Sequence, residues 1–235
     1  QKKVFNWNYI MKSKNINICF LLILSIFTFS CSDKEDQEDS TYYAEWTSVG
    51  DGLSANVTKN VLTEFVGSTK CPYCPATDSL LLSYFNSGHE NYVGSAITNK
   101  WFLVNYHTYS PSRGDPMYEF LRRDENENDY CYVRFEEGNW YNISGVPTTF
   151  TNGSWSSVNP DMAVTSMAES TPLQMSLDGT KIDGMDVIVR VSISSSLDMT
   201  SSDSLCLFIA ATMDNVDYEG SNNEKHHQDV FLGWI

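Results

Sequence analysis

The sequence predicts an α/β domain with parallel strands, followed by an all-β part. Three observations lead to this prediction. A short apolar run at 61–66 precedes a turn and a helical pattern that carries two cysteines, and a second apolar run at 101–107 indicates another buried strand. Beyond residue 170, apolar and polar residues instead alternate over 185–195, which is typical of a half-buried strand.

The N-terminal segment predicts export. A basic stretch from Met11 is followed by an apolar run at 18–29, shorter than the roughly 20 residues needed to cross a bilayer. We therefore expect residues 11–30 to be a signal peptide, and they resemble the signals of bacterial lipoproteins, with Cys31 as the lipidated residue. Residues 1–10 precede this start and are interpreted as upstream read-through.

Residues 31–56 are interpreted as an acidic, polar tether. The stretch SDKEDQED at 32–39 resembles the tethers of Bacteroidetes-type surface lipoproteins, although an ordinary solvated linker has the same composition. The expected location is the outer membrane, with the protein facing the cell surface or the periplasm.

Charge excludes one class of partner. Residues 1–30 contain four of the 15 basic residues and no acidic one, so the chain from Cys31 carries 11 basic and 30 acidic residues, a net charge of −19. Such a field repels phosphates, so we expect no nucleic-acid partner, and membrane contact only through the lipid anchor on Cys31.

Two cysteines two residues apart, Cys71 and Cys74, are the main chemical signal. Outside the cytoplasm such a pair persists as a disulfide. A zinc site would need two further Cys or His ligands at suitable spacing, and this segment does not supply them, so no metal is expected.

The helical pattern after the pair predicts which of the two cysteines is the nucleophile. Pro72 and Pro75 suit a first helical turn, apolar residues recur at helical spacing up to Phe85, and 86–88 reads as a stop. A helix N-terminus stabilises a thiolate and lowers the pKa of the first cysteine. The first cysteine is therefore the expected nucleophile, and Cys74, one turn into the helix, the resolving thiol.

Further elements follow the strand at 101–107. Asp115 and Pro116 predict the start of a helix at 117–123, and a second helix is possible at 129–135. The stretch SGVPTTF at 144–150 then reads as a strand, with a hairpin turn at 151–153.

This order of motifs resembles the thioredoxin fold. A CxxC at a strand-to-helix junction is followed by further α and β elements and then by Gly-Val-Pro-Thr and a strand. The resemblance implies a thioredoxin-like domain over 57–169, with an insertion around 108–140. It also implies that Pro147 is a cis-proline facing the cysteines, and that the backbone of Val146 pairs with a substrate peptide.

A narrower resemblance rests on three further stretches. They are YHTYSP at 106–111, GVPTTF at 145–150 and EKHHQDVF at 224–231. Together with the signal and tether, they resemble the outer membrane lipoproteins related to the twenty-eight kilodalton outer membrane protein. This family resemblance does not imply a particular reaction.

Three other side chains are candidates for the site. Glu64 lies near the position of the buried acid of thioredoxin-like enzymes, which implies a proton acceptor for Cys74. His107 ends a strand on the side where parallel sheets bind ligands and could lie near Cys71, or be an ordinary loop histidine. Tyr73 makes the CPYC tetrapeptide of glutaredoxins, but no glutathione site can be traced, so no cofactor is expected.

Residues 170–235 predict a second domain. A turn is expected at 178–179, a half-buried strand at 185–195 and a more deeply buried strand at 205–213. Together they suggest an antiparallel, immunoglobulin-like β-sandwich, which ends without closing strands and is therefore expected to be truncated.

Two further interpretations stay open. Cys131 and Cys206 either form a bridge between domains or are two buried free thiols. Acidic groups near the turns could bind Ca²⁺ or simply belong to hairpin turns. These acidic groups are Asp183, Asp186, Asp214, Asp217 and Glu219.

The sequence therefore supports two functions of different classes. The first is a thiol–disulfide oxidoreductase that acts on protein thiols or disulfides through Cys71 and Cys74 without a cofactor. The second is a non-catalytic surface binding or assembly lipoprotein with an unknown ligand, in which the pair is a structural staple. A two-residue loop makes a poor staple, because disulfide stabilisation shrinks with loop length, and this favours the first function.

Overall fold

The structure is a computed structural model that describes residues 4–12, 18–25, 47–48, 52–109, 111, 114–121, 141–182, 186–197 and 206–234. These residues form many strands and few helices. The helices are α1 Cys74–Phe85, α2 Ser95–Thr98, α3 Pro116–Leu121 and α5 Pro160–Met167. The strands are β1 Val4–Lys12, β2 Ile18–Ser25, β3 Thr47–Ser48, β4 Val57–Thr58, β5 Val61–Gly67, β6 Trp101–His107, β7 Thr148–Thr151, β8 Ser154–Ser156, β9 Ser170–Thr171, β10 Leu173–Ile182, β11 Asp186–Ser195, β12 Cys206–Met213, β13 Val216–Asp217, β14 His226–His227 and β15 Val230–Trp234.

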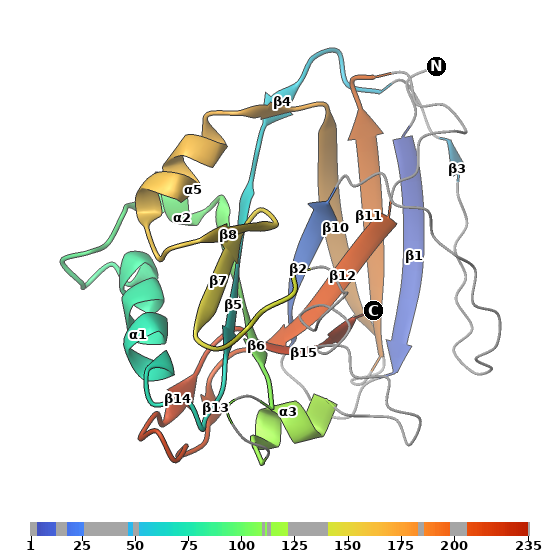
Figure 1. Cartoon of the computed structure of the whole chain (residues 1–235). Helices are drawn as coiled ribbons and strands as arrows, with labels where there is room; N and C mark the ends of the chain where they lie inside the picture. Colours follow the sequence, from blue (N-terminus) through green and yellow to red (C-terminus); the bar gives the residue numbers. More distant parts are fainter. Residues whose placement is uncertain are drawn as a thin grey trace.

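The cysteines follow β5, a strand of a seven-stranded mixed sheet (Figure 1). Its strand order is β2-β12-β15-β6-β5-β7-β8. β5 and β6 are parallel, whereas β7 runs antiparallel to β5 and forms a hairpin with β8. The hairpin turn places Asn152 and Gly153 at φ of 48° and 80°, the left-handed conformation that favours Asn-Gly. The strands predicted at 61–66 and 101–107 and the hairpin turn at 151–153 are confirmed, whereas the strand predicted at 144–150 begins only at Thr148.

The two faces of β5 pack against different surroundings because side chains alternate along a strand. Val61 packs with Tyr84 of α1 and Ala163 of α5, and Phe65 packs with Leu81 of α1. Figure 1 shows α1, α2 and α5 on this side of the sheet. Leu62 and Val66 of β5 instead enter a second core on the opposite face. Its other members are Val104, Tyr106, Phe150, Ala210, Ala211, Phe231 and Leu232.

The strands beyond residue 170 are divided between two sheets, and the predicted domain boundary at residue 170 stays a prediction. β12 and β15 join the seven-stranded sheet, where β15 pairs in parallel with β6, while β10 and β11 lie in a four-stranded sheet with β1 and β3. The strands beyond 170 thus belong to both sheets, and the immunoglobulin-like sandwich stays unconfirmed. An apolar run such as that in β12 suits the interior of any covered sheet, so its pattern does not identify its partners.

The predicted turn at 178–179 is wrong. β10 continues through these residues, with Asp178 opposite Arg190 and Gly179 opposite Val189 of β11. Every residue of β10 pairs with a residue of the long antiparallel strand β11. This pairing outweighs the preference of Asp-Gly for a turn. The strand predicted at 185–195 is confirmed as β11.

The segments predicted as read-through and signal peptide contain strands in the described chain. β1 pairs with β11, and β2 pairs with β12 along its whole length. Apolar, β-branched segments pair readily with open strand edges, which explains this placement. Cleavage before Cys31 stays a prediction, and Cys31 lies outside the described residues, as do most of the 108–140 insertion, Cys131 and the helix predicted at 129–135. Within the described ranges, no helix is long and apolar enough to cross a bilayer.

Candidate functional site

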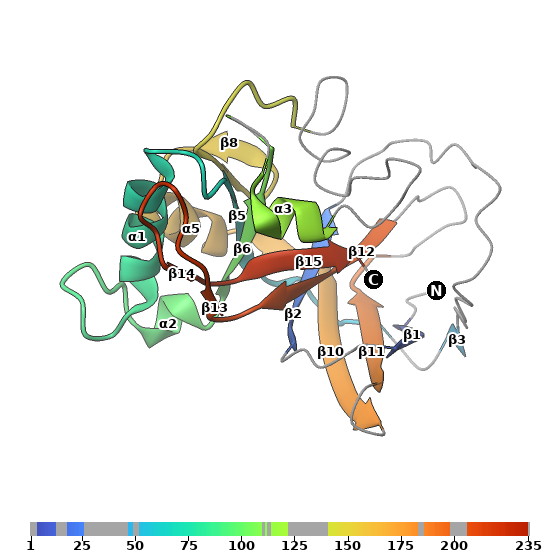
Figure 2. The ribbon, with the colours of Figure 1, turned by 90° about the horizontal axis from the view of Figure 1, so that it is seen from below.

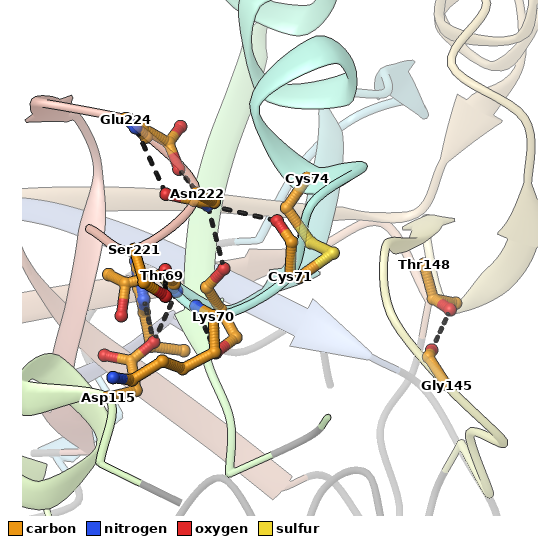
Figure 3. The surroundings of a disulfide bond; sticks show 12 residues. Thr69, Lys70, Cys71, Cys74, Asp115, Gly145, Thr148, Ser221, Asn222 and Glu224 are labelled. Atoms are coloured by element: carbon orange, nitrogen blue, oxygen red, sulfur yellow. Dashed lines mark hydrogen bonds and ion pairs between the residues drawn. A yellow bond between two sulfur atoms is a disulfide. The ribbon is translucent and has the colours of Figure 1, made fainter. Parts of the chain in front are cut away.

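Cys71 and Cys74 form a disulfide in the loop and helix that follow β5 (Figure 3). Each residue is only 1% exposed. The backbone N–H of Cys71 donates to the carbonyl of Ser68 at 3.0 Å, and α1 begins at Cys74, so Cys71 lies one turn ahead of the helix. The helix predicted after the pair is confirmed, including its end at Asn86, but it begins at Cys74, so the prediction that Cys74 lies one turn into the helix is wrong.

The segment before β7 lies beside the disulfide. The Val146–Pro147 peptide bond is cis, as the resemblance implied, and Val146 packs in the apolar cluster that contains both cysteines. β7 begins its pairing with β5 at Thr148, opposite Val66, so the backbone of Val146 lies beyond that ladder. The structure thus brings the predicted substrate-binding segment to the predicted redox pair.

Tyr73, between the cysteines, points outward. It is 74% exposed and serves as the N-cap residue of α1 without a capping hydrogen bond from its side chain. An exposed aromatic ring can supply contact area to a partner protein, and the substrate contact predicted for Tyr73 stays a prediction.

Glu64 does not lie where a proton acceptor for Cys74 is needed. Its carboxylate accepts hydrogen bonds from the hydroxyls of Tyr106, at 3.2 Å, and Tyr141. Tyr106 belongs to the core on the face of the sheet opposite α1, whereas the neighbouring Phe65 packs with the cysteines. The predicted role of Glu64 is therefore corrected: the period of two along β5 turns its side chain away from the disulfide.

His107 braces the cysteine loop through Asp115. Its Nδ1 lies 2.9 Å from Oδ2 of Asp115, which also accepts from the backbone N–H of Thr69 at 2.8 Å. The other oxygen of Asp115 accepts from the N–H groups of Met117 and Tyr118, so this side chain caps α3 as predicted. His107 is fully buried and is bonded to Asp115 rather than to either sulfur.

These contacts fix the charge of Asp115. Burial opposes its ionisation, but the hydrogen bond and charge of His107 and the N–H groups of Thr69 and Tyr118 outweigh burial and lower the pKa to about 2. Because an ionised carboxylate only accepts hydrogen bonds, Nδ1 of His107 must carry a hydrogen.

A hairpin from the C-terminal part holds the cysteine loop. Figure 2 shows the β13–β14 hairpin reaching α1, and Figure 3 shows Asn222 at its tip bonded to the loop. Nδ2 of Asn222 donates to the carbonyls of Ser68 at 3.2 Å and Cys71 at 3.1 Å, and its backbone N–H donates to the carbonyl of Thr69. A Cβ at Gly220 would lie 2.5 Å from Oδ1 of Asn222 and 3.0 Å from that carbonyl oxygen, so a larger residue would force the hairpin tip to shift.

Two carboxyl groups meet at this hairpin. Buried Asp78 of α1 lies close enough to Glu224 of the hairpin for the two groups to interact. Burial, followed by the repulsion and hydrogen bond of Glu224, raises the pKa of Asp78 to about 8. Asn105 donates to Asp78 at 3.3 Å, and Asn222 donates to Glu224 at 3.3 Å. The hairpin residue that touches Cys71 thus also positions one of the acids.

Further ionisable groups surround the carboxyl pair. His227 lies 3.7 Å from Glu224 and meets His107 edge to face, with ring centroids 5.3 Å apart. Burial, then the charge of His107, lowers the pKa of His227. Burial and the neighbouring Asp214 raise the pKa of Asp229 to about 7.

The described residues contain no group of three or more His, Cys, Asp or Glu side chains arranged to hold a metal ion. Three of the acidic residues considered for Ca²⁺ have separate neighbours in the structure. Asp214 lies beside Asp229, Asp217 pairs with His226, and Glu219 pairs with Lys225. The side chain of Cys206 lies outside the described residues, so its predicted bridge or free thiol stays a prediction.

No protein-family model and no curated protein matches this sequence. Among solved structures, HBP35 of Porphyromonas gingivalis is similar, with 13% identity and a TM-score of 0.37, over 75% of this chain and 56% of that one. The chain thus spans little more than half the length of that protein.

Sequence reasoning missed Asp78, Glu224, Asn222 and His227. Asp78 follows Cys74 by one helical turn, a spacing that marks it as a neighbour of that cysteine. The other three lie about 150 residues from the pair, and no local pattern in one sequence connects segments so far apart.

Proposed function

We propose that the protein is a thiol–disulfide oxidoreductase of thioredoxin-like fold that exchanges disulfides with partner proteins. The observation that carries this proposal is the position of the Cys71–Cys74 disulfide at the start of α1, packed against Val146 of the cis-proline segment. The chain order of β5, α1, the parallel β6 and the strand after Pro147 also supports it.

The exchange is proposed to proceed through Cys71. A partner thiolate attacks Sγ of Cys71, a bond forms between these two sulfurs, and the Cys71–Cys74 bond breaks with its electron pair leaving on Cys74. In the reverse direction, Cys74 attacks the mixed disulfide and releases the partner. The backbone of Val146, beyond the end of the β5–β7 ladder, is proposed to pair with the partner peptide.

The proposed setting is outside the cytoplasm, in the outer membrane. The apolar run ending at Cys31 and the acidic tether after it support a lipid-anchored protein. The net charge of −19 from Cys31 onward disfavours nucleic acid as a partner, and leaves protein thiols and disulfides as the proposed substrates.

Trapping of the mixed disulfide tests this function. In the full chain, Cys74→Ser should capture a peptide with one activated cysteine as a stable disulfide at residue 71, located by mass spectrometry of the proteolytic fragments. The matched control is the double variant Cys71→Ser/Cys74→Ser, which retains every other cysteine. Labelling at other cysteines alone, with residue 71 unlabelled, would contradict the proposal.

A second candidate function is favoured by one observation. Both cysteines are almost fully buried, and the hairpin tip is bonded to the loop that carries them. This arrangement suits a structural disulfide in a non-catalytic surface binding or assembly lipoprotein. The two functions predict different rates for reduction of the disulfide by a dithiol under native conditions. Reduction that is no faster than global unfolding of the protein would support the structural role.

A further inference from the structure

The tip of the β13–β14 hairpin, residues 220–224, is bonded to the loop that carries Cys71 (Figure 3). We propose that this tip is a redox-linked latch: it binds the cysteine loop more tightly in the disulfide form than in the dithiol form, and thereby favours the disulfide. Asn222 is the positioning residue of this latch. The inference goes beyond the proposed exchange function, because it holds for either candidate function.

Four hydrogen bonds join the tip to the backbone of the cysteine loop. Nδ2 of Asn222 donates to the carbonyls of Ser68 and Cys71, at 3.2 Å and 3.1 Å. The backbone N–H of Asn222 and Oγ of Ser221 both donate to the carbonyl of Thr69, each at 3.2 Å. Because every acceptor is a main-chain oxygen between β5 and α1, these bonds depend on the path of the loop rather than on its side chains.

The tip holds the Asn222 amide in the orientation that these bonds need. Its Oδ1 accepts from the backbone N–H of Glu224 at 3.1 Å, which leaves Nδ2 to face the loop. Two backbone bonds close the turn: Gly220 donates to the carbonyl of Glu224 at 2.8 Å, and Asn223 donates to the carbonyl of Gly220 at 3.0 Å. The hairpin itself therefore places the donor.

The hairpin is anchored at its base and depends on the loop at its tip. β13 and β14 are each two residues long, and His227 at the base is fully buried. The ion pairs of Asp217 with His226 and of Glu219 with Lys225 join side chains that are more than half exposed, so they contribute little. The tip can therefore separate from the loop while the base stays in place.

Reduction of the disulfide must move the two sulfurs apart. A dithiol that reduces the bond supplies two electrons and two protons, one proton for each sulfur, and itself becomes a disulfide. Sulfurs that are about 2 Å apart as a bond then need roughly 3.5–4 Å as non-bonded atoms. Cys71 and Cys74 are packed among Phe65, Leu81 and Leu103, and a protein interior has few voids to accept this separation. The backbone of one cysteine must therefore move.

Cys71 is the member of the pair that moves. Cys74 is the first residue of α1 and is held by the helix, whereas Cys71 lies in the loop before it. The carbonyl of Cys71 accepts from Nδ2 of Asn222 and from the N–H of Cys74, the latter at 3.4 Å. Displacement of Cys71 weakens the bond to Asn222. By linkage, a tip that binds the disulfide form more tightly stabilises the disulfide by the same factor.

The test measures both sides of this linkage in the full chain. The first measurement is the reduction potential of the Cys71–Cys74 pair, by equilibration against thiol–disulfide buffers, in the wild type, Asn222→Ala and the matched control Asn223→Gly. Asn223 lies in the same tip, is exposed, and has a φ of 67°, which suits glycine.

The second measurement is amide hydrogen exchange of residues 218–227, read by mass spectrometry in the oxidised and the reduced wild type. Exchange of these amides reports how often the hairpin opens locally. The double variant Cys71→Ser/Cys74→Ser controls for reduction of the other cysteines.

The loss of one or two hydrogen bonds changes an equilibrium about tenfold. Asn222→Ala should therefore shift the pair toward the dithiol about tenfold, which makes the potential about 30 mV less negative, and Asn223→Gly should match the wild type. Reduction should speed exchange at the tip of the wild-type hairpin about tenfold and leave the double variant unchanged. A substitution that only weakened the fold would destabilise both redox forms and leave the potential where it was.

Either of two results would overturn the inference: an equilibrium constant in Asn222→Ala within about twofold of the wild-type value, or wild-type hairpin exchange that does not respond to reduction. If Asn222→Ala does not fold, Ser221→Ala, which removes one of the four bonds, takes its place and should shift the potential in the same direction. Failure to trap a mixed disulfide at residue 71, with both linkage results as expected, would contradict the proposed function and leave the latch standing.

Discussion

Asn222 donates a hydrogen bond from Nδ2 to the carbonyl oxygen of Cys71 at 3.1 Å, across a sequence separation of 151 residues. The same side-chain nitrogen lies within hydrogen-bond distance of Ser68 and Glu224. A hairpin far along the chain therefore fixes the conformation of the loop that carries the disulfide. This dependence gives the C-terminal part of the chain a role in the site.

Substitution of Asn222 should weaken this attachment. Asn222→Ala removes several partly buried hydrogen bonds, each worth about 1 kcal/mol, so the free energy of unfolding should fall by about 1–3 kcal/mol. The measurement is urea unfolding of the oxidised full chain. The control is Asn99→Ala, at an exposed position, which should change stability by less than about 0.5 kcal/mol. Equal effects of the two substitutions would show that the hairpin does not hold the loop.

Glu64 should matter for stability and not for exchange. Glu64→Gln disturbs the hydrogen bonds from Tyr106 and Tyr141 inside the core, which should cost about 1–2 kcal/mol. The rate of disulfide opening should stay within about twofold of the wild type, because the side chain lies on the opposite face of the sheet from α1. A tenfold slower rate in a folded Glu64→Gln protein would restore the role predicted from the sequence.

Asp115 should make the fold sensitive to acid. Its pKa is about 2 in the folded chain, below the ordinary 3.8, so ionised Asp115 stabilises the folded state above pH 4, and this contribution is lost as pH falls toward 2. The contribution is about 2 kcal/mol at pH 7. Asp115→Asn should therefore reduce unfolding free energy at pH 7, and the difference from wild type should shrink by pH 2.5. A difference that stays constant with pH would contradict this account of Asp115.

Asp229 should have the opposite pH dependence. Its pKa is about 7 in the folded chain, so the folded state binds more protons than the unfolded state between pH 4 and pH 7, and stability falls as pH rises through this window. Asp229→Asn removes that penalty, and asparagine suits the local φ of 52°. We expect a gain of about 1–3 kcal/mol at pH 8 and little change at pH 4, measured by urea unfolding. Destabilisation at pH 8 would be the contrary result.

Local features of the fold were predictable where the hydrophobic pattern and the turn or cap residues indicate the same element. The run at 101–107 became β6 with the same bounds, and Asn152-Gly153 formed the hairpin turn. Asp115 capped α3 because an Asp before a proline suits a helix start. These features depend on neighbours within a few residues, and one sequence contains that information.

Features that depend on distant pairing were not predictable. β15 lies between β12 and β6, although nothing in its five residues identifies those partners. Glu64 was placed near Cys74 by its distance along the chain, whereas the alternation of β5 turns it to the other face. Asp78 resembles an ordinary helix residue in the sequence, because its neighbour Glu224 lies far along the chain.

The most direct test of the central claim is the reduction potential of the Cys71–Cys74 pair in the full chain, measured by equilibration against thiol–disulfide buffers and read at this pair by mass spectrometry. The account predicts a potential within the range of roughly −120 to −270 mV spanned by disulfide-exchanging enzymes. A potential below roughly −300 mV would identify a structural bond and contradict the account.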